Sequence, residues 1–310
     1  MTSYRRDNLI WFRGEVVRES EANISVLSPT AQFGLNVFEG IRCYWNNEYR
    51  ELYAFRLKDH LERLLRSCRL LRLRPPHNFL EIESFMRGVI AANDFEEDIS
   101  VRLTVFVDGQ GSWHSSDPVS MFIAPIAKAR SDVLRIPVYS ACISSWQRIS
   151  DNVLPPRAKV GANYINGRYA HLQARQDGYD FPIFLGADGK VAEGAGACLF
   201  LVRDGQICTP DKTSSILESI TRDTIMQIAV EAGMVVNERA IDRTELYLAD
   251  EIFLCGSAAE ISPITSVDGY VIGSGEVGEI TKNLLTQYLE IADGRNARYR
   301  KWLTSIYLKN

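Results

Sequence analysis

Lys159 lies in a setting where a lysine could take part in chemistry. The segment 155–164 reads Pro-Pro-Arg-Ala-Lys-Val-Gly-Ala-Asn-Tyr and joins an extended stretch to the expected start of a helix. Junctions of this kind are where α/β proteins place reactive groups. An arbitrary lysine is nevertheless a solvated surface residue, because lysines are rarely buried. Lys159 is therefore either a reactive or a solvated residue, and other motifs in the sequence are needed to distinguish the two interpretations.

Glu193 opens a run of small residues, Glu-Gly-Ala-Gly-Ala, at 193–197. Small residues let the backbone come close to a flat or bulky group. A carboxylate in that place could pair with a ring nitrogen. The alternative is a β-turn with an exposed acid, which the run by itself predicts equally well.

The segment 214–223, Ser-Ser-Ile-Leu-Glu-Ser-Ile-Thr-Arg-Asp, brings hydroxyl groups to the expected N-terminus of a helix. Free amide groups and the helix dipole make such an end a phosphate-binding site. Ser219 or Thr221 would also serve as a simple N-cap without any ligand. Taken alone, the segment favours capping.

Residues 273–278, Gly-Ser-Gly-Glu-Val-Gly, match the pattern G-x-G-x-x-G of dinucleotide-binding sites. That pattern requires a strand before it and a second strand after the helix, within one βαβ unit. Only about 30 residues follow it here, and no second strand is expected among them. A glycine-rich turn before the last helix is the better interpretation.

The elements that must position these groups begin with a small N-terminal α/β domain, expected at 1–126. Apolar residues at helical spacing predict helices at 57–73 and 81–93. Two strand-like runs, 101–107 and 119–125, follow on either side of a turn. The arginines near the first helix are expected on its solvated side: Arg63, Arg66, Arg69, Arg72 and Arg74.

A polar, basic stretch at 127–132 is the predicted linker to a larger domain at 133–310. A length of 310 residues agrees with two domains, since it exceeds what one hydrophobic core usually serves. Asp242 and Glu245 match a capping box for a short helix. The other expected elements are helices at 163–177, 221–232 and from about residue 277, and strands at 136–145, 182–185, 197–202 and 251–255.

The composition excludes several classes of protein. Apolar residues make up 46% and charged residues 24%, which is typical of globular proteins and not of disordered ones. A net charge of −4 argues against nucleic acid or acidic membranes as partners. The six cysteines and four histidines are dispersed, so neither a metal site nor a disulfide framework is expected. Without a signal-like or bilayer-spanning apolar run, the expected location is cytoplasmic.

Taken together, these segments resemble the class IV, or fold-type IV, pyridoxal-phosphate-dependent aminotransferases, and among them the branched-chain amino acid aminotransferases. The resemblance covers nearly the whole chain. It implies pyridoxal 5'-phosphate (PLP) as cofactor and an α/β (α+β) fold, in which a small N-terminal α/β domain precedes a larger, barrel-like domain. The ordered motifs that carry it are Val37–Arg42, Lys159–Tyr164, Glu193–Gly196, Ile220–Asp223, Tyr247–Glu251 and Gly256–Glu260.

The resemblance also implies a role for individual residues. Lys159 would carry PLP as a Schiff base and later move a proton as general base and acid. Tyr164 would hydrogen-bond the phenolic oxygen of PLP, and Glu193 would keep the pyridine nitrogen protonated. The other residues implied to hold PLP are Arg63, Gly196, Leu217, Ile220, Thr221 and Ser257. The residues implied to contact substrate are Phe33, Phe38, Gly40, Ser100, Arg102, Ile126 and Ala258.

Several residues implied to contact substrate differ from the family pattern. Typical bacterial members have tyrosines at Phe33 and Ser100 and a large aromatic residue at Ile126. Phe33 cannot donate a hydrogen bond, and Ser100 is shorter than tyrosine. Arg102 still suits a carboxylate such as that of glutamate, although an ion pair within the strand is the alternative. With Trp113 in the nearby loop, we expect a reshaped pocket and an altered donor preference.

Other functions remain open at this point. D-amino-acid transaminases, (R)-amine transaminases and aminodeoxychorismate lyases share the lysine, the glutamate and the phosphate site, and Val37–Arg42 favours the branched-chain group. From other classes, a nucleotide-binding oxidoreductase or a binding protein without activity would explain part of the sequence. The resemblance implies amino acid and keto acid substrates, with 2-oxoglutarate as acceptor. It further implies a homodimer or larger homo-oligomer, with a loop from the neighbouring subunit closing the site.

Overall fold

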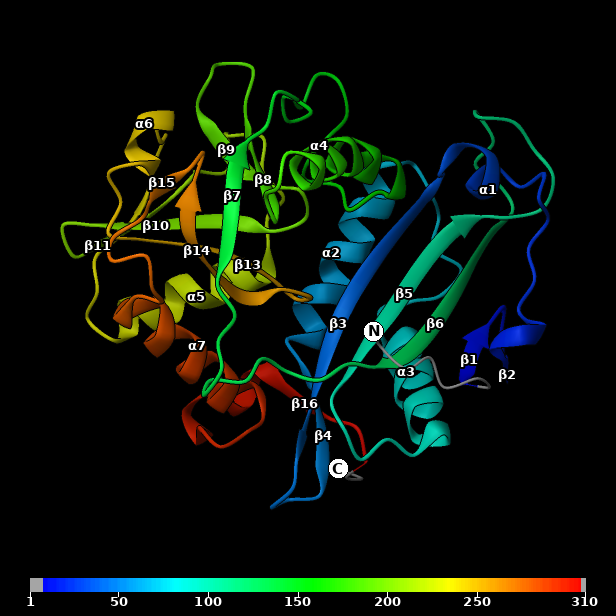
Figure 1. Ribbon diagram of the computed structural model, residues 1–310. Helices are drawn as coiled ribbons and strands as arrows, with labels where there is room; N and C mark the ends of the chain where they lie inside the picture. The colour runs from blue at the N-terminus through cyan, green and yellow to red at the C-terminus, as the bar shows by residue number, and fades with distance from the viewer. Residues whose placement is uncertain (1–7, 308–310) are drawn as a thin grey trace. The chain divides into compact units, whose positions relative to one another are not determined.

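A computed structural model describes residues 8–307 (Figure 1). Within them the chain forms two units. The first unit comprises residues 8–130, Ala158–Ala162 and 290–307, and the second comprises Ser131–Arg157 and Asn163–Leu289. The domain limits expected from the sequence, 1–126 and 133–310, stay a prediction. Lys159 belongs to the first unit, although nearly 30 residues of the second unit precede its segment.

The strands of the first unit form an antiparallel seven-stranded sheet in the order β16-β4-β3-β5-β6-β1-β2 (Figure 1). Its bounds are β1 Leu9–Phe12, β2 Glu15–Arg18, β3 Asn36–Asn46, β4 Glu51–Phe55, β5 Ile99–Val107, β6 Val119–Ala127 and β16 Leu303–Ser305. The predicted strands at 101–107 and 119–125 are confirmed as β5 and β6. Three short helical segments complete the unit: Glu19–Glu21, α1 Pro29–Phe33 and Ala297–Trp302.

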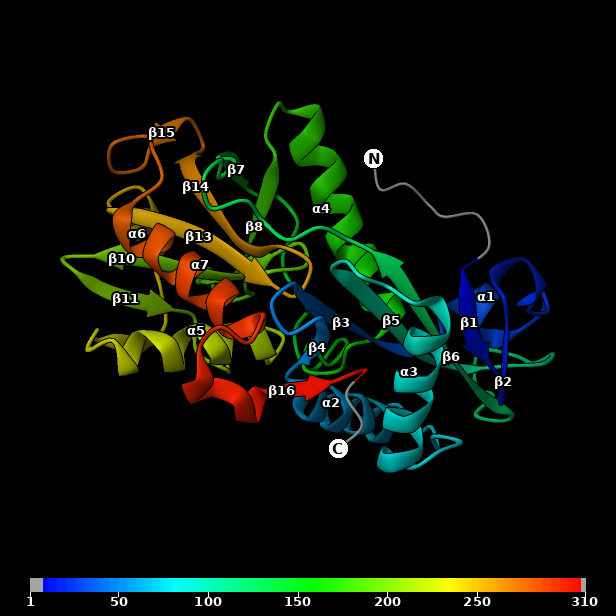
Figure 2. The same cartoon turned by 90° about the horizontal axis from the view of Figure 1, so that it is seen from below.

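Two helices, α2 (Leu57–Leu70) and α3 (Phe79–Asn93), cover one face of this sheet (Figure 2). Alternate residues of a strand point to opposite faces, so Ile41, Leu103 and Ile123 join the helices in one apolar core. The intervening residues of β3, β5 and β6 point to the other face. That alternation separates a helix-covered face from a helix-free face, and both carry residues of the candidate site.

The second unit contains a mixed nine-stranded sheet in the order β12-β11-β10-β13-β14-β7-β8-β9, with β15 paired to β14. Its bounds are β7 Tyr139–Ile143, β8 Phe181–Leu185, β9 Val191–Gly194, β10 Cys198–Arg203, β11 Gln206–Thr209, β12 Val236–Glu238, β13 Glu251–Gly256, β14 Glu260–Val267 and β15 Tyr270–Val271. The helices are α4 Tyr164–Gln176, α5 Ile220–Glu231, α6 Arg243–Leu246 and α7 Glu279–Ala292, of which α7 runs on into the first unit. Helix α4 packs on β8 and α5 on β13.

The helices predicted from the sequence are confirmed, but the prediction that Arg63 lies on the solvated face of α2 is wrong. The predicted helices at 57–73, 81–93, 163–177 and 221–232 are confirmed as α2, α3, α4 and α5, and the capping box of Asp242 and Glu245 is present. Arg63, however, is 4% exposed and does not lie on the solvated side of α2. Leu70 of the same helix is 51% exposed. The physical reason is a buried partner for Arg63 on β3.

The glycine pattern at 273–278 serves the start of α7. Glu251 accepts hydrogen bonds from the backbone amides of Ile280 and Thr281 at 3.0 and 2.7 Å. A Cβ on Gly278 would lie 1.9 Å from the Glu251 side chain, so a glycine is needed there. The carboxylate occupies the helix end that a dinucleotide phosphate would require. This arrangement rules out the dinucleotide interpretation of the motif.

Across residues 8–307, none of the helices is both long and apolar enough to span a bilayer.

Candidate active site

The backbone of Lys159 is fixed by two elements of the first unit. The amide of Phe38 on β3 donates to the Lys159 carbonyl at 3.0 Å, and Val37 and Val160 form an isolated β-bridge. The Lys159 amide donates to Oγ of Ser67 on α2 at 3.1 Å. Its Nζ lies 4.9 Å from the centroid of the Phe38 ring. The half-buried lysine is therefore held at a defined place and is not a freely solvated surface residue.

Arg63 is buried because Glu39 neutralises it. Its Nε and Nη2 donate to the two carboxylate oxygens of Glu39 at 2.8 and 2.7 Å, and His60 Nδ1 lies 2.8 Å from Oε2 of Glu39. Glu39 points to the helix-covered face of β3, where α2 presents both partners. A bidentate guanidinium–carboxylate pair is among the strongest hydrogen-bonded ion pairs.

The charges of this cluster follow from its burial. Burial alone would raise the pKa of the Glu39 carboxyl, but the charge and hydrogen bonds of Arg63, helped by His60, hold it well below its usual range. Burial lowers the pKa of His60 despite its hydrogen bond to Glu39. We infer an ionised Glu39, a charged Arg63 and a neutral His60 at neutral pH.

Five of the residues expected to contact substrate share the helix-free face of the first sheet. Gly40 lies opposite Arg102, and Ser100 lies opposite Ile126, in the strand ladders. Phe38, two residues before Gly40, points the same way. The sheet thus brings Phe38, Gly40, Ser100, Arg102 and Ile126 to one surface.

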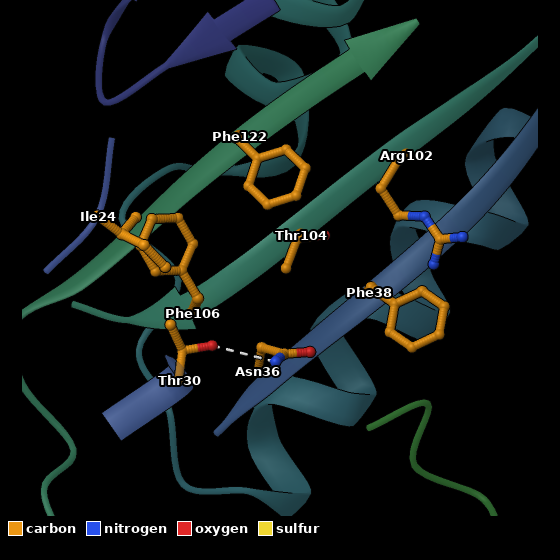
Figure 3. Close-up of a pocket in the computed structure, with 8 residues that line it drawn as sticks. All are labelled: Ile24, Thr30, Asn36, Phe38, Arg102, Thr104, Phe106 and Phe122. Carbon is orange, nitrogen blue, oxygen red and sulfur yellow. Dashed lines mark hydrogen bonds between the residues drawn. The ribbon is translucent and has the colours of Figure 1, made fainter. Parts of the chain in front are cut away.

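A cavity of about 300 Å³ lies on this face (Figure 3). Its walls include Ile24, Phe38, Arg102, Thr104, Phe106 and Phe122. Thr30 and Asn36 complete the lining, and the Asn36 amide donates to the Thr30 hydroxyl at 3.0 Å.

Arg102 lies at one side of this cavity. Its guanidinium carbon is 4.4 Å from the centroid of the Phe38 ring. No described residue forms an ion pair with it, in contrast to the strand ion pair considered as the alternative. Phe38 therefore has both the Lys159 ammonium and the Arg102 guanidinium near its ring.

The second unit brings together four residues expected to hold the cofactor ring. A Cβ placed on Gly196 would lie 3.8 Å from the Tyr164 ring, so the two residues are neighbours. Glu193 is 4% exposed and accepts a hydrogen bond from the Leu217 amide at 3.2 Å. Its other oxygen pairs with Arg148 Nη2 at 2.8 Å. Glu193 is thus a buried acceptor paired with Arg148, and the interpretation as an exposed turn residue is wrong.

The N-terminus of α5 has free donors. Ser219 is its N-cap and accepts from the Arg222 amide at 3.2 Å. The amides of Ile220 and Thr221 lie in the first turn, where a helix offers no backbone acceptor. Thr221 is 3% exposed, and no described residue hydrogen-bonds its hydroxyl. Ser219 thus caps the helix and satisfies one amide, while no described residue accepts a hydrogen bond from the amides of Ile220 and Thr221.

A Cβ on Gly256 would lie 3.5 Å from the carbonyl oxygen of Gly196, so the residue directly before Ser257 is a neighbour of the segment 193–197. Ser257 and Ala258 follow β13 directly, in the turn before β14. Phe33 is the last residue of α1 and is 43% exposed.

Sequence reasoning missed several supporting residues. Glu39, His60 and Ser67 are buried polar residues that hold Arg63 and Lys159, and Arg148 pairs with Glu193. One signal was present for α2, since His60, Arg63 and Ser67 recur at spacings of three and four along one helix face. No local signal marks Arg148, whose partner is 45 residues away in the chain.

These groups fit the chemistry of a pyridoxal-phosphate enzyme. A buried carboxylate can accept from a ring nitrogen, and unpaired amides with an unpartnered hydroxyl can bind a phosphate. A lysine with a fixed backbone and an ammonium beside an apolar ring suits a covalent link to a carbonyl cofactor. The fold and the site therefore define an enzyme that binds PLP.

Comparison with known proteins narrows the class. The family model described as Amino-transferase class IV matches residues 36–267. A branched-chain-amino-acid aminotransferase of Escherichia coli is 36% identical over 312 residues, covering 99% of each chain. The chain belongs to the class IV aminotransferases, and accordingly it is a PLP-dependent aminotransferase of fold-type IV.

Solved structures agree with this assignment. The PLP form of a branched-chain amino acid aminotransferase from Thermobaculum terrenum has a TM-score of 0.93 and 42% identity, covering 98% of this chain and 99% of that one. A branched-chain aminotransferase from Thermoproteus uzoniensis, solved with norvaline, has a TM-score of 0.90 and 40% identity, covering 97% of this chain and 100% of that one.

Proposed function

We propose that this enzyme transfers the amino group of a branched-chain L-amino acid to 2-oxoglutarate. The observation that carries the proposal is the Arg102 guanidinium, which has no ion-pair partner among residues 8–307 and shares the Phe38 ring with Lys159 Nζ. A guanidinium in that place can bind the second carboxylate of glutamate or 2-oxoglutarate. The apolar surface of Phe38 and Ile126 suits an aliphatic side chain. The names of the relatives support a branched-chain donor.

We propose that the chain binds PLP through the residues that the family resemblance implies. Lys159 would form the Schiff-base link, Tyr164 and Glu193 would bind the ring, and Leu217 would pack on it. Gly196 has no side chain, which leaves room for a flat ring. The phosphate ligands would be Arg63, Ile220, Thr221 and Ser257.

When bound, PLP withdraws electrons from the substrate α-carbon. Glu193, which is buried, would hold a proton on the ring nitrogen. As general base, Lys159 Nζ would take the proton from the substrate α-carbon. As general acid, it would then give that proton to the cofactor carbon that had carried the Schiff base. Arg63, neutralised by Glu39, would position the phosphate without adding uncompensated charge to the core.

The proposal includes the substrate contacts and the assembly. Phe33, Phe38, Gly40, Ser100, Ile126 and Ala258 would line the substrate site together with Arg102. A homodimer or larger homo-oligomer is proposed from the family resemblance. A cytoplasmic location is supported by six free, buried cysteines, which suit a reducing compartment.

A donor panel tests the proposal. The purified enzyme with PLP is assayed with L-leucine, D-alanine and (R)-1-phenylethylamine against 2-oxoglutarate. We expect turnover with L-leucine and formation of glutamate. Turnover with only D-alanine or the (R)-amine would contradict the proposed donor class, and Arg102→Met should raise the KM for 2-oxoglutarate about tenfold or more.

A further inference from the structure

Arg148 is a nearly buried cation of the second unit. Its side chain is 11% exposed, and its Nε is buried without a hydrogen-bond partner among residues 8–307. Nη2 pairs with Oε1 of Glu193 at 2.8 Å, and Nη1 donates to Oδ1 of Asn166 at 3.3 Å. The guanidinium carbon lies 5.9 Å from the centroid of the Phe184 ring. A buried ion pair adds little net stability compared with apolar side chains of similar size, so stability alone does not explain Arg148.

The surrounding elements fix the place of the guanidinium. The Arg148 amide donates to the carbonyl oxygen of Leu185, the last residue of β8, at 2.9 Å. Asn166 of α4 donates through Nδ2 to the Gln147 carbonyl at 3.0 Å, while its Oδ1 accepts from Arg148. Both β8 and α4 therefore hold Arg148 where its charge meets Glu193.

The two carboxylate oxygens of Glu193 have different donors. Oε2 accepts from the Leu217 amide at 3.2 Å, and the Cys198 thiol lies 3.6 Å from the same oxygen. Both of these donors are neutral. Oε1 instead faces the guanidinium of Arg148, which carries a full positive charge. Arg148 therefore acts on Glu193 by its charge as well as by its hydrogen bond.

A buried carboxylate beside a pyridine nitrogen shares one proton with it. With the proton on the nitrogen both partners are charged, and with the proton on the carboxyl group both are neutral. Burial favours the neutral form, because charged groups lose their hydration. A cation at hydrogen-bond distance favours an ionised carboxyl group by about 1–3 pKa units, which moves the proton equilibrium about 10- to 1,000-fold toward the nitrogen.

We infer that Arg148 is a positioning residue for transamination, which acts through Glu193 and keeps the shared proton on the ring nitrogen of PLP. The inference rests on the proposed role of Glu193 and adds a residue to it. With Arg148 present, the ring keeps the positive charge that withdraws electrons from the substrate. Without Arg148, the proton moves from the ring nitrogen to the Glu193 carboxylate, and the ring becomes neutral.

The test measures where the proton lies. The purified enzyme is loaded with PLP carrying ¹⁵N in the ring, and its ¹⁵N resonance is recorded at neutral pH. We expect a protonated ring nitrogen in the wild type and an unprotonated one in Arg148→Met. Arg148→Lys keeps a cation and should restore the protonated signal. Arg175→Met makes the same change at an exposed arginine of α4 and should keep the wild-type signal.

Kinetics separates a positioning role from a structural one. In Arg148→Met, kcat with the preferred amino donor should fall about tenfold or more, while the KM of that donor changes less than about threefold. Glu193→Gln removes the group through which Arg148 acts, so adding Arg148→Met to it should lower kcat no further. If Arg148→Met does not fold, Arg148→Gln removes the charge and keeps a hydrogen-bond donor, and the same results are expected.

The outcomes distinguish this inference from the proposed function. A protonated ring nitrogen in a folded Arg148→Met or Arg148→Gln enzyme would overturn the inference and leave the proposed transamination intact. A further loss of kcat in the double variant, as large as in Arg148→Met alone, would have the same consequence. An unprotonated ring in the wild type would remove the proposed role of Glu193 together with the inference, and a wild type inactive with every donor would remove the proposed function.

Discussion

Glu39 is the buried carboxylate that neutralises Arg63. It is fully buried and pairs with Arg63 through both carboxylate oxygens. Removing one member of a buried ion pair leaves the other charge uncompensated, which costs about 3–5 kcal/mol. We expect Glu39→Gln to lower the free energy of unfolding by that amount in urea denaturation. Glu62→Gln, an exposed change on α2, should stay within about 0.5 kcal/mol of the wild type. Equal effects of the two changes would show that the pair is not a buried one in solution.

His60 predicts a dependence of stability on pH. Burial lowers its pKa below the ordinary 6.5, so the unfolded chain takes up a proton that the folded chain resists. Stability is therefore fully present above pH 6.5 and is lost as the pH falls below it. In His60→Asn, the slope of unfolding free energy between pH 7 and 5.5 should be shallower than in the wild type, by at most about 1.4 kcal/mol per pH unit. The control His114→Asn changes a residue in an exposed loop and should leave the slope of the wild type unchanged. If His60→Asn also leaves the slope unchanged, the pKa of His60 is not lowered by burial.

At the scale of elements, helix α4 comes closest to the segment 195–197, which follows β9, at Gly167. A Cβ on Gly167 would lie 2.6 Å from the carbonyl oxygen of Ala195, and backbone cannot move aside as a side chain can. Gly167→Ala should therefore push α4 away from Gly196, destabilise the protein by about 1–3 kcal/mol and weaken PLP binding. Gly88 of α3 has nothing within 4 Å of such a Cβ.

Gly88→Ala is therefore the matched control for Gly167→Ala. It should stabilise the protein by about 0.5–1 kcal/mol, since alanine has the higher helix propensity. Thermal denaturation and PLP dissociation measured on both variants check the prediction. Weakened PLP binding in both, or in neither, would contradict the close approach of α4.

The elements also show what the sequence could predict. The limits of α2, α4 and α5 follow from periodic leucines, glycine stops and caps, which are local signals. The burial of Arg63 does not follow, because it depends on Glu39, which reaches it only after β3 and α2 have packed. The place of 158–162 in the first unit likewise depends on the Val37–Val160 bridge, which joins residues more than 120 positions apart. Local patterns predict elements and motifs, and tertiary pairing decides which polar residues are buried.

At the scale of the whole molecule, all six cysteines are free and buried. Burial raises the pKa of the Cys198 thiol to about 12, and that of Cys68 to about 12. Only the thiolate reacts with disulfide reagents, so the folded protein should react very slowly at pH 8. Titration with such a reagent should detect six thiols once the protein is unfolded in guanidinium. Rapid reaction of one or more thiols in the folded protein would contradict the burial.

The central claim for the molecule is that Lys159 binds the cofactor covalently. The direct measurement is reduction of the holoenzyme with borohydride, followed by proteolysis and mass spectrometry of the peptides. The account predicts a phosphopyridoxyl group on Lys159 alone, bleaching of the visible absorbance, and no such band in Lys159→Ala, whereas Lys190→Ala keeps it. A label on any other lysine, or a holoenzyme that borohydride leaves unlabelled, would contradict the account.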